Sequence, residues 1–128
     1  MKTNIKKKYL ETVVQNGFYS NKRNLNNHVN FIFKKTPLEG KRVLDVGGGL
    51  GILTYWAAVN GGFGVLLEPE FDGSSEGMQA GFKMLGEQLD VDSPERVKFN
   101  SITFQDYDNS ELFDVIVLAN SINHLNES

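Results

Sequence analysis

The stretch VLDVGGGLG, residues 43–51, constrains the fold of this chain more than any other segment. A short apolar run ends at Asp45, and glycines follow at positions 47, 48, 49 and 51. A buried strand followed by a glycine-rich turn and an apolar helix is typical of an α/β protein that binds its ligand at the carboxyl ends of parallel strands. Glycine permits positive φ and lets a ligand press on bare backbone. Asp45 would repel a phosphate at this turn, so the part of the ligand that lies there is not expected to be a phosphate group.

The remaining sequence predicts alternating helices and strands. Apolar periodicity predicts helices over residues 5–16, 25–35, 52–59 and 74–89, and strands over 41–46, 63–68, 96–100 and 112–120. Residues 18–27 are polar and are expected to form a loop, and Asp72, Ser74 or Ser75 is expected to cap the last helix. Nearly continuous apolar strands predict a mostly parallel sheet with helices on both faces. The fold class is therefore α/β, a Rossmann-like three-layer αβα arrangement with short N-terminal helices added.

Length and composition narrow the class of protein. The 128 residues suffice for one domain, with residues 1–40 as a helical extension and residues 41–128 as the Rossmann-like core. No apolar run is long enough for a membrane span, and the N-terminus lacks the apolar segment of a signal peptide. The absence of cysteine and the wide separation of the two histidines, His28 and His124, argue against a metal site. The expected protein is cytoplasmic, without a membrane partner.

Charge is distributed unevenly along the chain. Residues 1–42 hold ten basic and two acidic residues, and residues 43–128 hold three basic and fourteen acidic ones. This polarity could steer an anionic partner to the N-terminal part. The simpler interpretation, which we favour, is that Lys2, Lys6, Lys7 and Lys8 form a solvated tail.

The spacing of the glycines separates two ligand classes. The dinucleotide fingerprint G-x-G-x-x-G is not met, because Ile52 stands where its last glycine should be when counting from Gly47. The sequence instead fits D-x-G-x-G-x-G, with Asp45, Gly47, Gly49 and Gly51. This pattern resembles motif I of the class I S-adenosylmethionine-dependent methyltransferases. A sulfonium and an ammonium group, with no phosphate, are consistent with the nearby carboxylate.

The resemblance implies further cofactor contacts. Glu68, at the end of the second strand, would accept hydrogen bonds from the ribose hydroxyls, and Pro69 would flank the adenine. Many relatives place an Asp on the loop after the third strand, where this chain has Ile102 or Thr103, so backbone groups of Ser101 and Ile102 are expected to serve instead. Asn120, after the fourth strand, would contact the cofactor or orient the substrate.

Polar residues after the fourth strand are the candidates for catalysis. His124 is the expected general base and Asn123 is expected to hold the substrate, although His124 fits equally well as a helix-start residue. The segment ANSI differs from the Asn/Asp-Pro-Pro-Tyr/Phe pattern of methyltransferases that modify nucleic-acid bases or glutamine amides, which favours a small-molecule acceptor over nucleic acid. Tyr19 is interpreted either as a residue that closes over the cofactor or as a core aromatic.

The resembled fold has seven strands in the order 3-2-1-4-5-7-6, of which this chain supplies strands 1 to 4. Strand 112–120 is therefore expected to be a long apolar edge, which soluble proteins usually avoid. Three explanations remain open: a fragment truncated after strand 4, a chain completed by a partner, or a homodimer paired at this edge. The functional alternatives are a non-catalytic Rossmann-like binding or assembly module that pairs through strand 4 and, less favoured, a nicotinamide-dependent oxidoreductase.

Overall fold

A computed structural model of the chain describes residues 2–34, 36–46, 51–67, 75–91, 93–100 and 113–118. Its elements follow in the order helix α1 (Lys2–Gln15), helix α2 (Lys22–Phe33), strand β1 (Arg42–Val46), helix α3 (Ile52–Val59), strand β2 (Phe63–Leu67), helix α4 (Ser75–Leu89), strand β3 (Val97–Asn100) and strand β4 (Val115–Val117). Every predicted helix and strand is present, and the differences lie at their ends.

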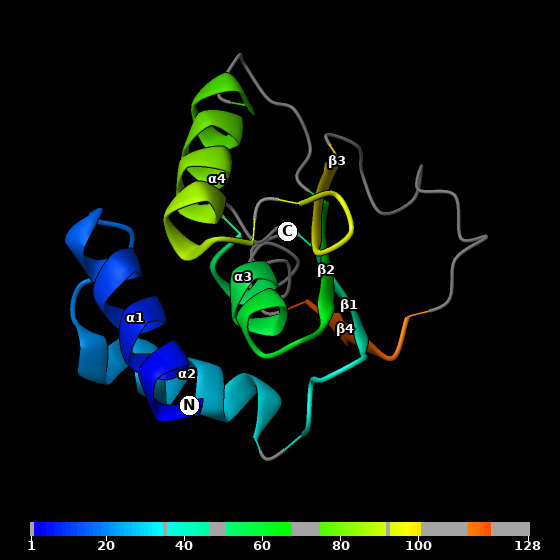
Figure 1. The fold of residues 1–128 in the computed structure, drawn as a ribbon, viewed down its shortest axis with the longest axis horizontal. Coiled ribbons are helices and arrows are strands. Elements are labelled where there is room, and N and C mark those ends of the chain that lie inside the picture. Colours follow the sequence, from blue (N-terminus) through cyan, green and yellow to red (C-terminus); the bar gives the residue numbers. More distant parts are fainter. Residues whose placement is uncertain are drawn as a thin grey trace, which may run out of the picture.

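The four strands form one sheet in the order β3-β2-β1-β4, with all three pairings parallel (Figure 1). The central strand β1 places Asp45 beside Leu66 of β2 and Val117 of β4. Parallel neighbours require a crossover between them, and α3 and α4 supply those between β1 and β2 and between β2 and β3. The predicted α/β fold with strand order 3-2-1-4 is confirmed.

Two element boundaries differ from the sequence-based expectation. The segment predicted as a loop over 18–27 contains the first turns of α2, because the side chain of Asn21 accepts a hydrogen bond of 2.8 Å from the Asn24 N–H and caps the helix. The strand predicted over 112–120 covers only Val115–Val117 among the described residues. Its neighbours Asp114 and Leu118 are not strand, although Asp114 is bonded twice to Arg42: its N–H donates to the Arg42 carbonyl at 2.8 Å and its carboxylate accepts the Arg42 N–H at 2.8 Å.

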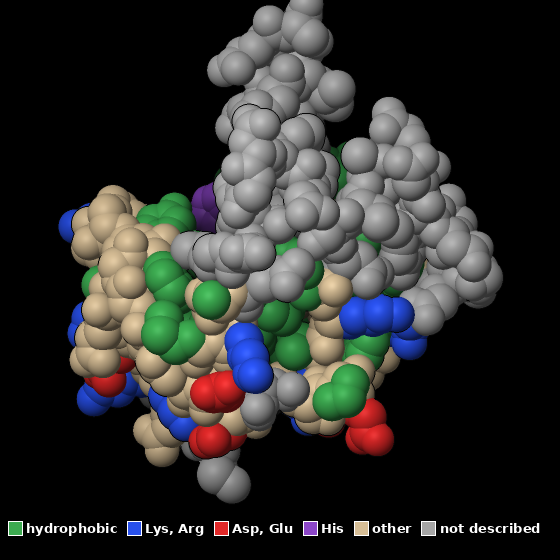
Figure 2. Space-filling view, turned by 90° about the horizontal axis from the view of Figure 1, so that it is seen from above, with side chains coloured by type: hydrophobic (Ala, Val, Ile, Leu, Met, Phe, Trp, Pro, Cys, Tyr) green, Lys and Arg blue, Asp and Glu red, His purple; other side chains and the backbone are tan. Residues whose placement is uncertain are grey.

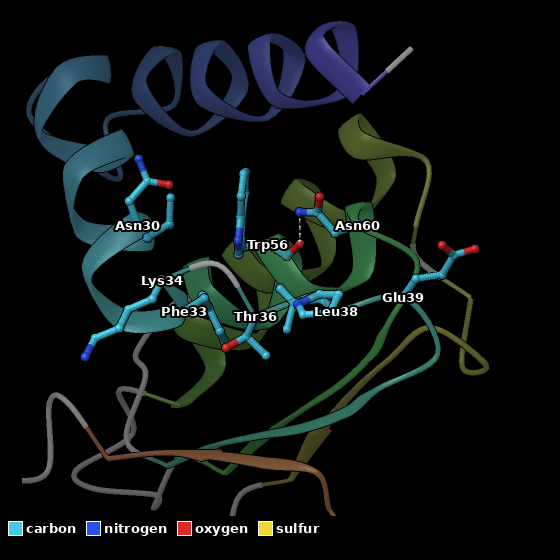
Figure 3. Close-up of a pocket in the computed structure, with 10 residues that line it drawn as sticks. Asn30, Phe33, Lys34, Thr36, Leu38, Glu39, Trp56 and Asn60 are labelled. Carbon is cyan, nitrogen blue, oxygen red and sulfur yellow. Dashed lines mark hydrogen bonds between the residues drawn. The ribbon is translucent and has the colours of Figure 1, made fainter.

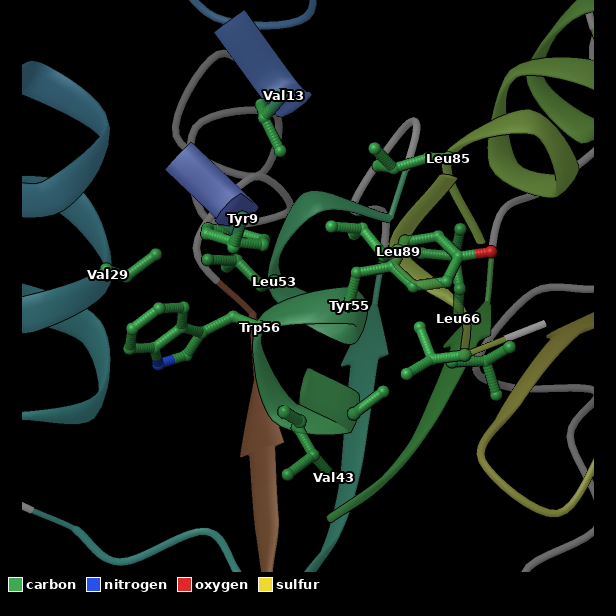
Figure 4. Close-up of a cluster of buried hydrophobic side chains, with 14 of the residues drawn as sticks. Tyr9, Val13, Val29, Val43, Leu53, Tyr55, Trp56, Leu66, Leu85 and Leu89 are labelled. Atoms are coloured by element: carbon green, nitrogen blue, oxygen red, sulfur yellow. The ribbon is translucent and has the colours of Figure 1, made fainter. Parts of the chain in front are cut away.

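The described helices cover one face of the sheet. Val43 and Leu66 point into a core formed with Tyr55 of α3 and Leu85 of α4 (Figure 4). Leu44, Val65 and Leu67 point to the opposite face and are also buried. Within the described ranges the sheet therefore carries one helical side, and a helical layer on the other face, as the three-layer prediction requires, is not among them.

The N-terminal helices are part of this core rather than an appendage. Helix α1 packs on α2, α3 and α4, and its Tyr9 ring lies 5.0 Å from the ring of Trp56. Tyr9 and Val13 of α1 and Leu25 and Val29 of α2 are fully buried. Residues 1–40 were predicted as an extension, but their apolar side chains join the main hydrophobic cluster because α1 alone cannot bury its apolar face.

The N-terminal lysines lie on α1, not in a solvated tail as the sequence suggested. Lys7 and Lys8 remain exposed, and Lys8 forms an ion pair of 3.1 Å with Asp90 after α4. Figure 2 shows that basic and acidic side chains also lie close together on the described part of the face drawn there. An exposed pair of this kind contributes little stability, so the apolar contacts hold α1 in place.

Candidate functional site

The candidate site lies at the carboxyl end of β1, where Asp45 is 2% exposed. The hydroxyl of Thr54 in α3 donates a hydrogen bond of 3.0 Å to Asp45 Oδ2. A buried carboxylate is costly to desolvate unless hydrogen bonds or charges compensate it. Thr54, in the first turn of α3, provides one such bond and fixes the carboxylate between strand and helix.

Gly64 of β2 allows α3 to approach the sheet closely enough for this contact. A Cβ at Gly64 would lie 2.6 Å from Thr54 Cγ2 and 2.7 Å from the Thr54 carbonyl oxygen. A side chain at this position would therefore displace Thr54 from its place above β1 and β2. A glycine in the middle of a strand is otherwise destabilising, so its value here is the close helix–strand approach.

Gly51 ends the glycine-rich turn and begins α3. Its φ is +79°, a conformation that side-chain-bearing residues rarely adopt, and its carbonyl accepts the Tyr55 N–H at 2.9 Å. A Cβ at Gly51 would also lie 2.6 Å from Cδ1 of Phe82 in α4. Both the backbone conformation and the packing of α4 therefore require glycine at the last position of the predicted motif.

Tyr9 reaches the same region from α1, which the sequence did not predict. Its hydroxyl donates a 2.7 Å hydrogen bond to the carbonyl of Ile52, the first residue of α3. Burial, then the negative charge of Asp45, then Tyr19, raise the pKa of Tyr9 well above its ordinary value. In the sequence Tyr9 is one apolar position of an amphipathic helix, and nothing in that pattern indicates which carbonyl its hydroxyl meets.

Tyr19 packs against the main hydrophobic cluster, with its ring 5.9 Å from His28. This contact agrees with the interpretation of Tyr19 as a core aromatic.

The structure describes two of the predicted site residues: Asp45 near the end of β1 and Gly51 at the start of α3. The other predicted cofactor and catalytic residues lie outside the described residues: Gly47, Gly49, Glu68, Pro69, Ser101, Ile102, Asn120, Asn123 and His124. The proposed helix caps Asp72 and Ser74 also lie outside them, and Ser75 is the first residue of α4.

The described arrangement suits a cation. The Asp45 carboxylate is held near the carboxyl end of β1, and α/β proteins bind ligands at the carboxyl ends of their strands. A carboxylate in a desolvated position attracts an ammonium or sulfonium group more strongly than it would in water.

Among the described residues, no group of three or more His, Cys, Asp or Glu side chains is placed to hold a metal ion. None of the helices in that part of the chain is long and apolar enough to cross a membrane.

Sequence comparison with family models and with curated proteins gives no match. Comparison of the fold with solved structures does give matches. YjhP from E. coli superimposes with a TM-score of 0.51 at 26% sequence identity, over 73% of this chain and 34% of YjhP. An RNA methyltransferase from Salinibacter ruber, solved with S-adenosyl-L-homocysteine, superimposes with a TM-score of 0.56 at 21% identity. That match covers 79% of this chain and 63% of the RNA methyltransferase.

At these identities the likeness concerns the fold. Three observations on this chain accompany the likeness. They are the parallel order β3-β2-β1-β4, the buried Asp45 at the end of β1, and the positive φ of Gly51. The chain therefore shares a Rossmann-like α/β fold with this RNA methyltransferase, and its glycine-rich turn resembles motif I of the class I S-adenosylmethionine-dependent methyltransferases.

Proposed function

We propose that this chain binds S-adenosylmethionine and takes part in methyl transfer to a small-molecule acceptor. The observation that carries the proposal is the buried carboxylate of Asp45, held by Thr54 at the carboxyl end of β1. A carboxylate at this position favours a ligand with positive groups over one with phosphates. The fold shared with a methyltransferase solved with S-adenosyl-L-homocysteine supports the same ligand class.

The residues present are compatible with the cofactor. Asp45 would stabilise its positively charged methionyl end, and the backbone of the turn from Gly47 to Gly51 would lie against it. By resemblance, Glu68 would hold the ribose, Pro69, Ser101 and Ile102 would border the adenine, and Asn120 would lie near the transferable group. When bound, the cofactor supplies an electrophilic methyl group on a sulfonium.

The protein's part in the reaction is to position an acceptor and to remove its proton. His124 is our proposed general base and Asn123 our proposed acceptor-binding residue, both from the sequence after β4. An imidazole is suitable because its ordinary pKa of about 6.5 allows it to accept a proton near neutral pH. A cytoplasmic location belongs to the same proposal.

Calorimetric titration with S-adenosyl-L-homocysteine tests the binding step. We expect saturable heat for the unaltered protein and at least about tenfold weaker binding for Asp45→Asn, since one charge-assisted contact is lost. Asp90→Asn removes an exposed carboxylate far along the chain and is the matched control, expected to bind like the unaltered protein. An absence of heat would refute the proposed cofactor, and equal binding by Asp45→Asn would refute the proposed role of Asp45.

Methyl transfer is a separate measurement. The assay follows formation of S-adenosyl-L-homocysteine in the presence of a panel of small amines, thiols and carboxylates, with His124→Gln as the variant. Activity that is independent of the panel, or unaffected by the His124 substitution, would contradict the proposed roles while leaving cofactor binding intact.

A second candidate function is assembly through β4. Ile116 and Leu118 are 50% and 39% exposed, and β4 pairs with β1 alone among the described strands. A homodimer or a completing chain would cover these side chains. Light scattering decides: a dimer that dissociates in Ile116→Glu supports pairing, and a strict monomer excludes the homodimer.

A further inference from the structure

Helix α2 presents to solvent a face on which every charged side chain is positive. The helix packs against α1 (Figure 1) and buries its apolar face through Leu25, Val29 and Phe33. Between Glu11 and Glu39 the sequence contains no acidic residue. The face of α2 that remains in solvent therefore carries no negative side chain.

Part of this face is a stripe along the helix. Arg23, Asn27 and Phe31 lie next to one another, because residues four apart on a helix are neighbours, and Lys34 follows at the C-terminal end. All four are exposed, and Phe31, at 76%, is the most exposed large apolar side chain among the described residues. Arg23 and Lys34 form no ion pair with another described residue. Both charges are therefore available to a partner.

The other side of the helix end borders a cavity of about 170 Å³ beside Trp56 (Figure 3). The side chain of Lys34 points away from Trp56 and from this cavity. Glu39 and the C-terminal ends of α2 and α3 border the cavity, so it offers no favourable place to an anion. An anionic partner is therefore expected on the exposed face of α2 and not in the cavity.

The combination of side chains on this face indicates the class of partner. A single exposed apolar side chain needs no explanation, but Phe31 lies between cations on a face without acids. The exposed side chains of Asn24, Asn27 and Asn30 offer hydrogen-bond donors and acceptors on the same helix. Cations that meet phosphates, a ring on which a base stacks, and amides that meet base edges are the components of single-stranded nucleic-acid recognition.

An anionic membrane is the other partner that positive charge attracts, and this face fits it less well. A helix that lies on a membrane presents several large apolar side chains together. On α2 the large apolar side chains other than Phe31 are buried or half-buried. A lone ring among amides suits a nucleobase better than a lipid phase.

We propose that this face binds single-stranded RNA, with a base stacked on Phe31 and the backbone following the helix between Arg23 and Lys34. From residue 23 to residue 34 the helix rises about 17 Å, at about 1.5 Å per residue. A strand carries one phosphate about every 3.4 Å, so the face spans about five nucleotides. RNA is favoured over DNA because its 2′-hydroxyl, like the amides, both donates and accepts hydrogen bonds. The face belongs to α2 and is independent of the proposed cofactor.

Fluorescence anisotropy of a labelled RNA of about ten nucleotides tests the proposal, and a sequence of A and C alone keeps the RNA single-stranded. We expect saturable binding. DNA of the same sequence should bind at least about twofold more weakly, because the 2′-hydroxyl contacts are lost. The duplex with the complementary RNA should bind at least about fivefold more weakly, because its bases are not free to stack on Phe31.

Three outcomes would overturn the proposal. They are the absence of saturable RNA binding, binding of the DNA or of the duplex equal to that of the RNA, and binding to vesicles of phosphatidylcholine and phosphatidylserine without binding to RNA. The last outcome would assign the face to a membrane.

A pair of apolar variants locates the bound base. Phe31→Ala should weaken RNA binding at least about fivefold, since the stacking contact is lost. Met84→Ala shortens an exposed apolar side chain on α4 and is expected to bind RNA as before. Circular dichroism checks that both variants remain folded. Equal affinities of the two variants would refute the role of Phe31.

A pair of charge variants locates the backbone. Arg23→Gln should reduce the slope of log affinity against log salt concentration by about 0.7, because one phosphate contact is lost. Lys83→Gln removes one exposed positive charge from α4 and is expected to leave this slope unchanged. Equal slopes in the two variants would show that the RNA does not follow α2 and would refute the proposed surface.

Discussion

The hydroxyl of Tyr9 donates a 2.7 Å hydrogen bond to the carbonyl of Ile52, the first residue of α3. This bond connects the N-terminal helix to the turn of α3 that follows Gly51 and contains Thr54. Because Thr54 in turn holds Asp45, α1 and the candidate site are joined by a short chain of contacts. Helix α1 therefore supports the candidate site through these contacts and also covers part of the hydrophobic core.

Removing the Tyr9 hydroxyl is expected to weaken the fold. Tyr9→Phe leaves the Ile52 carbonyl without this donor, and the free energy of unfolding should fall by about 1–2 kcal/mol in urea denaturation. Tyr19→Phe is the matched control, since Tyr19 is only partly buried and its hydroxyl makes no hydrogen bond among the described residues. Equal stabilities of the two variants would show that the Tyr9 bond contributes nothing.

Stability should decrease at alkaline pH through the same residue. Burial and the charge of Asp45 raise the pKa of Tyr9 above its ordinary value of 10.0. Since the unfolded chain releases this proton at a lower pH than the folded chain, the free energy of unfolding falls as the pH rises above about 10. Urea denaturation at about pH 9 and about pH 11 measures the decrease.

Variants at three positions test this dependence of the unfolding free energy on pH. Tyr9→Phe should reduce the alkaline loss, whereas Tyr19→Phe should leave it. Asp45→Asn should lower the pKa of Tyr9, because the neighbouring negative charge is gone. A tyrosinate absorbance titration with no difference between Asp45→Asn and the unaltered protein would contradict this assignment.

Substitution of Gly51 should cost more than substitution of a glycine with the same backbone conformation in open space. Gly51→Ala requires positive φ, at about 1–2 kcal/mol, and also overlaps Phe82, at about 1–3 kcal/mol more. Gly17→Ala shares the positive φ, +76°, but a Cβ there meets nothing within 4 Å. Thermal unfolding followed by circular dichroism should rank the two variants in this order, and the opposite order would refute the predicted overlap.

Loss of the Thr54 hydroxyl should destabilise the buried carboxylate. Thr54→Val keeps the shape of the side chain but removes the 3.0 Å bond to Asp45, at a cost of about 1.5–3 kcal/mol. Thr12→Val makes the same change on α1, where the side chain is only partly buried, and is expected to change stability by less than about 0.5 kcal/mol. Similar losses of unfolding free energy in both variants would show that the hydrogen bond from Thr54 to Asp45 does not stabilise the fold.

One substitution should stabilise the protein. Lys34 ends α2 with φ +52° and ψ −125°, a backbone conformation that favours glycine. Lys34→Gly should therefore raise the free energy of unfolding by about 1 kcal/mol. Lys34→Ala removes the same charge without relieving the backbone, so a melting temperature equal to that of Lys34→Gly would argue against strain at this position.

The order of elements and the carboxyl-end position of Asp45 followed from the amino-acid sequence alone. Strand and helix periodicities are local properties, and a glycine-rich turn after an apolar strand limits the possible topologies to a few. Element ends were less predictable. The cap provided by Asn21 depends on one hydrogen bond, from the Asn24 N–H, which periodicity does not specify.

The tertiary structure decided how distant residues meet. Only the packing of α1 on α3 brings Tyr9 to Ile52, and only the absence of a side chain at Gly64 brings Thr54 down to Asp45. The cavity beside Trp56 likewise arises where the ends of α2 and α3 lie next to each other. The sequence determined which faces are apolar, but which faces pack together depends on shape and steric fit between segments far apart in the chain, and these are set only when the whole core is assembled.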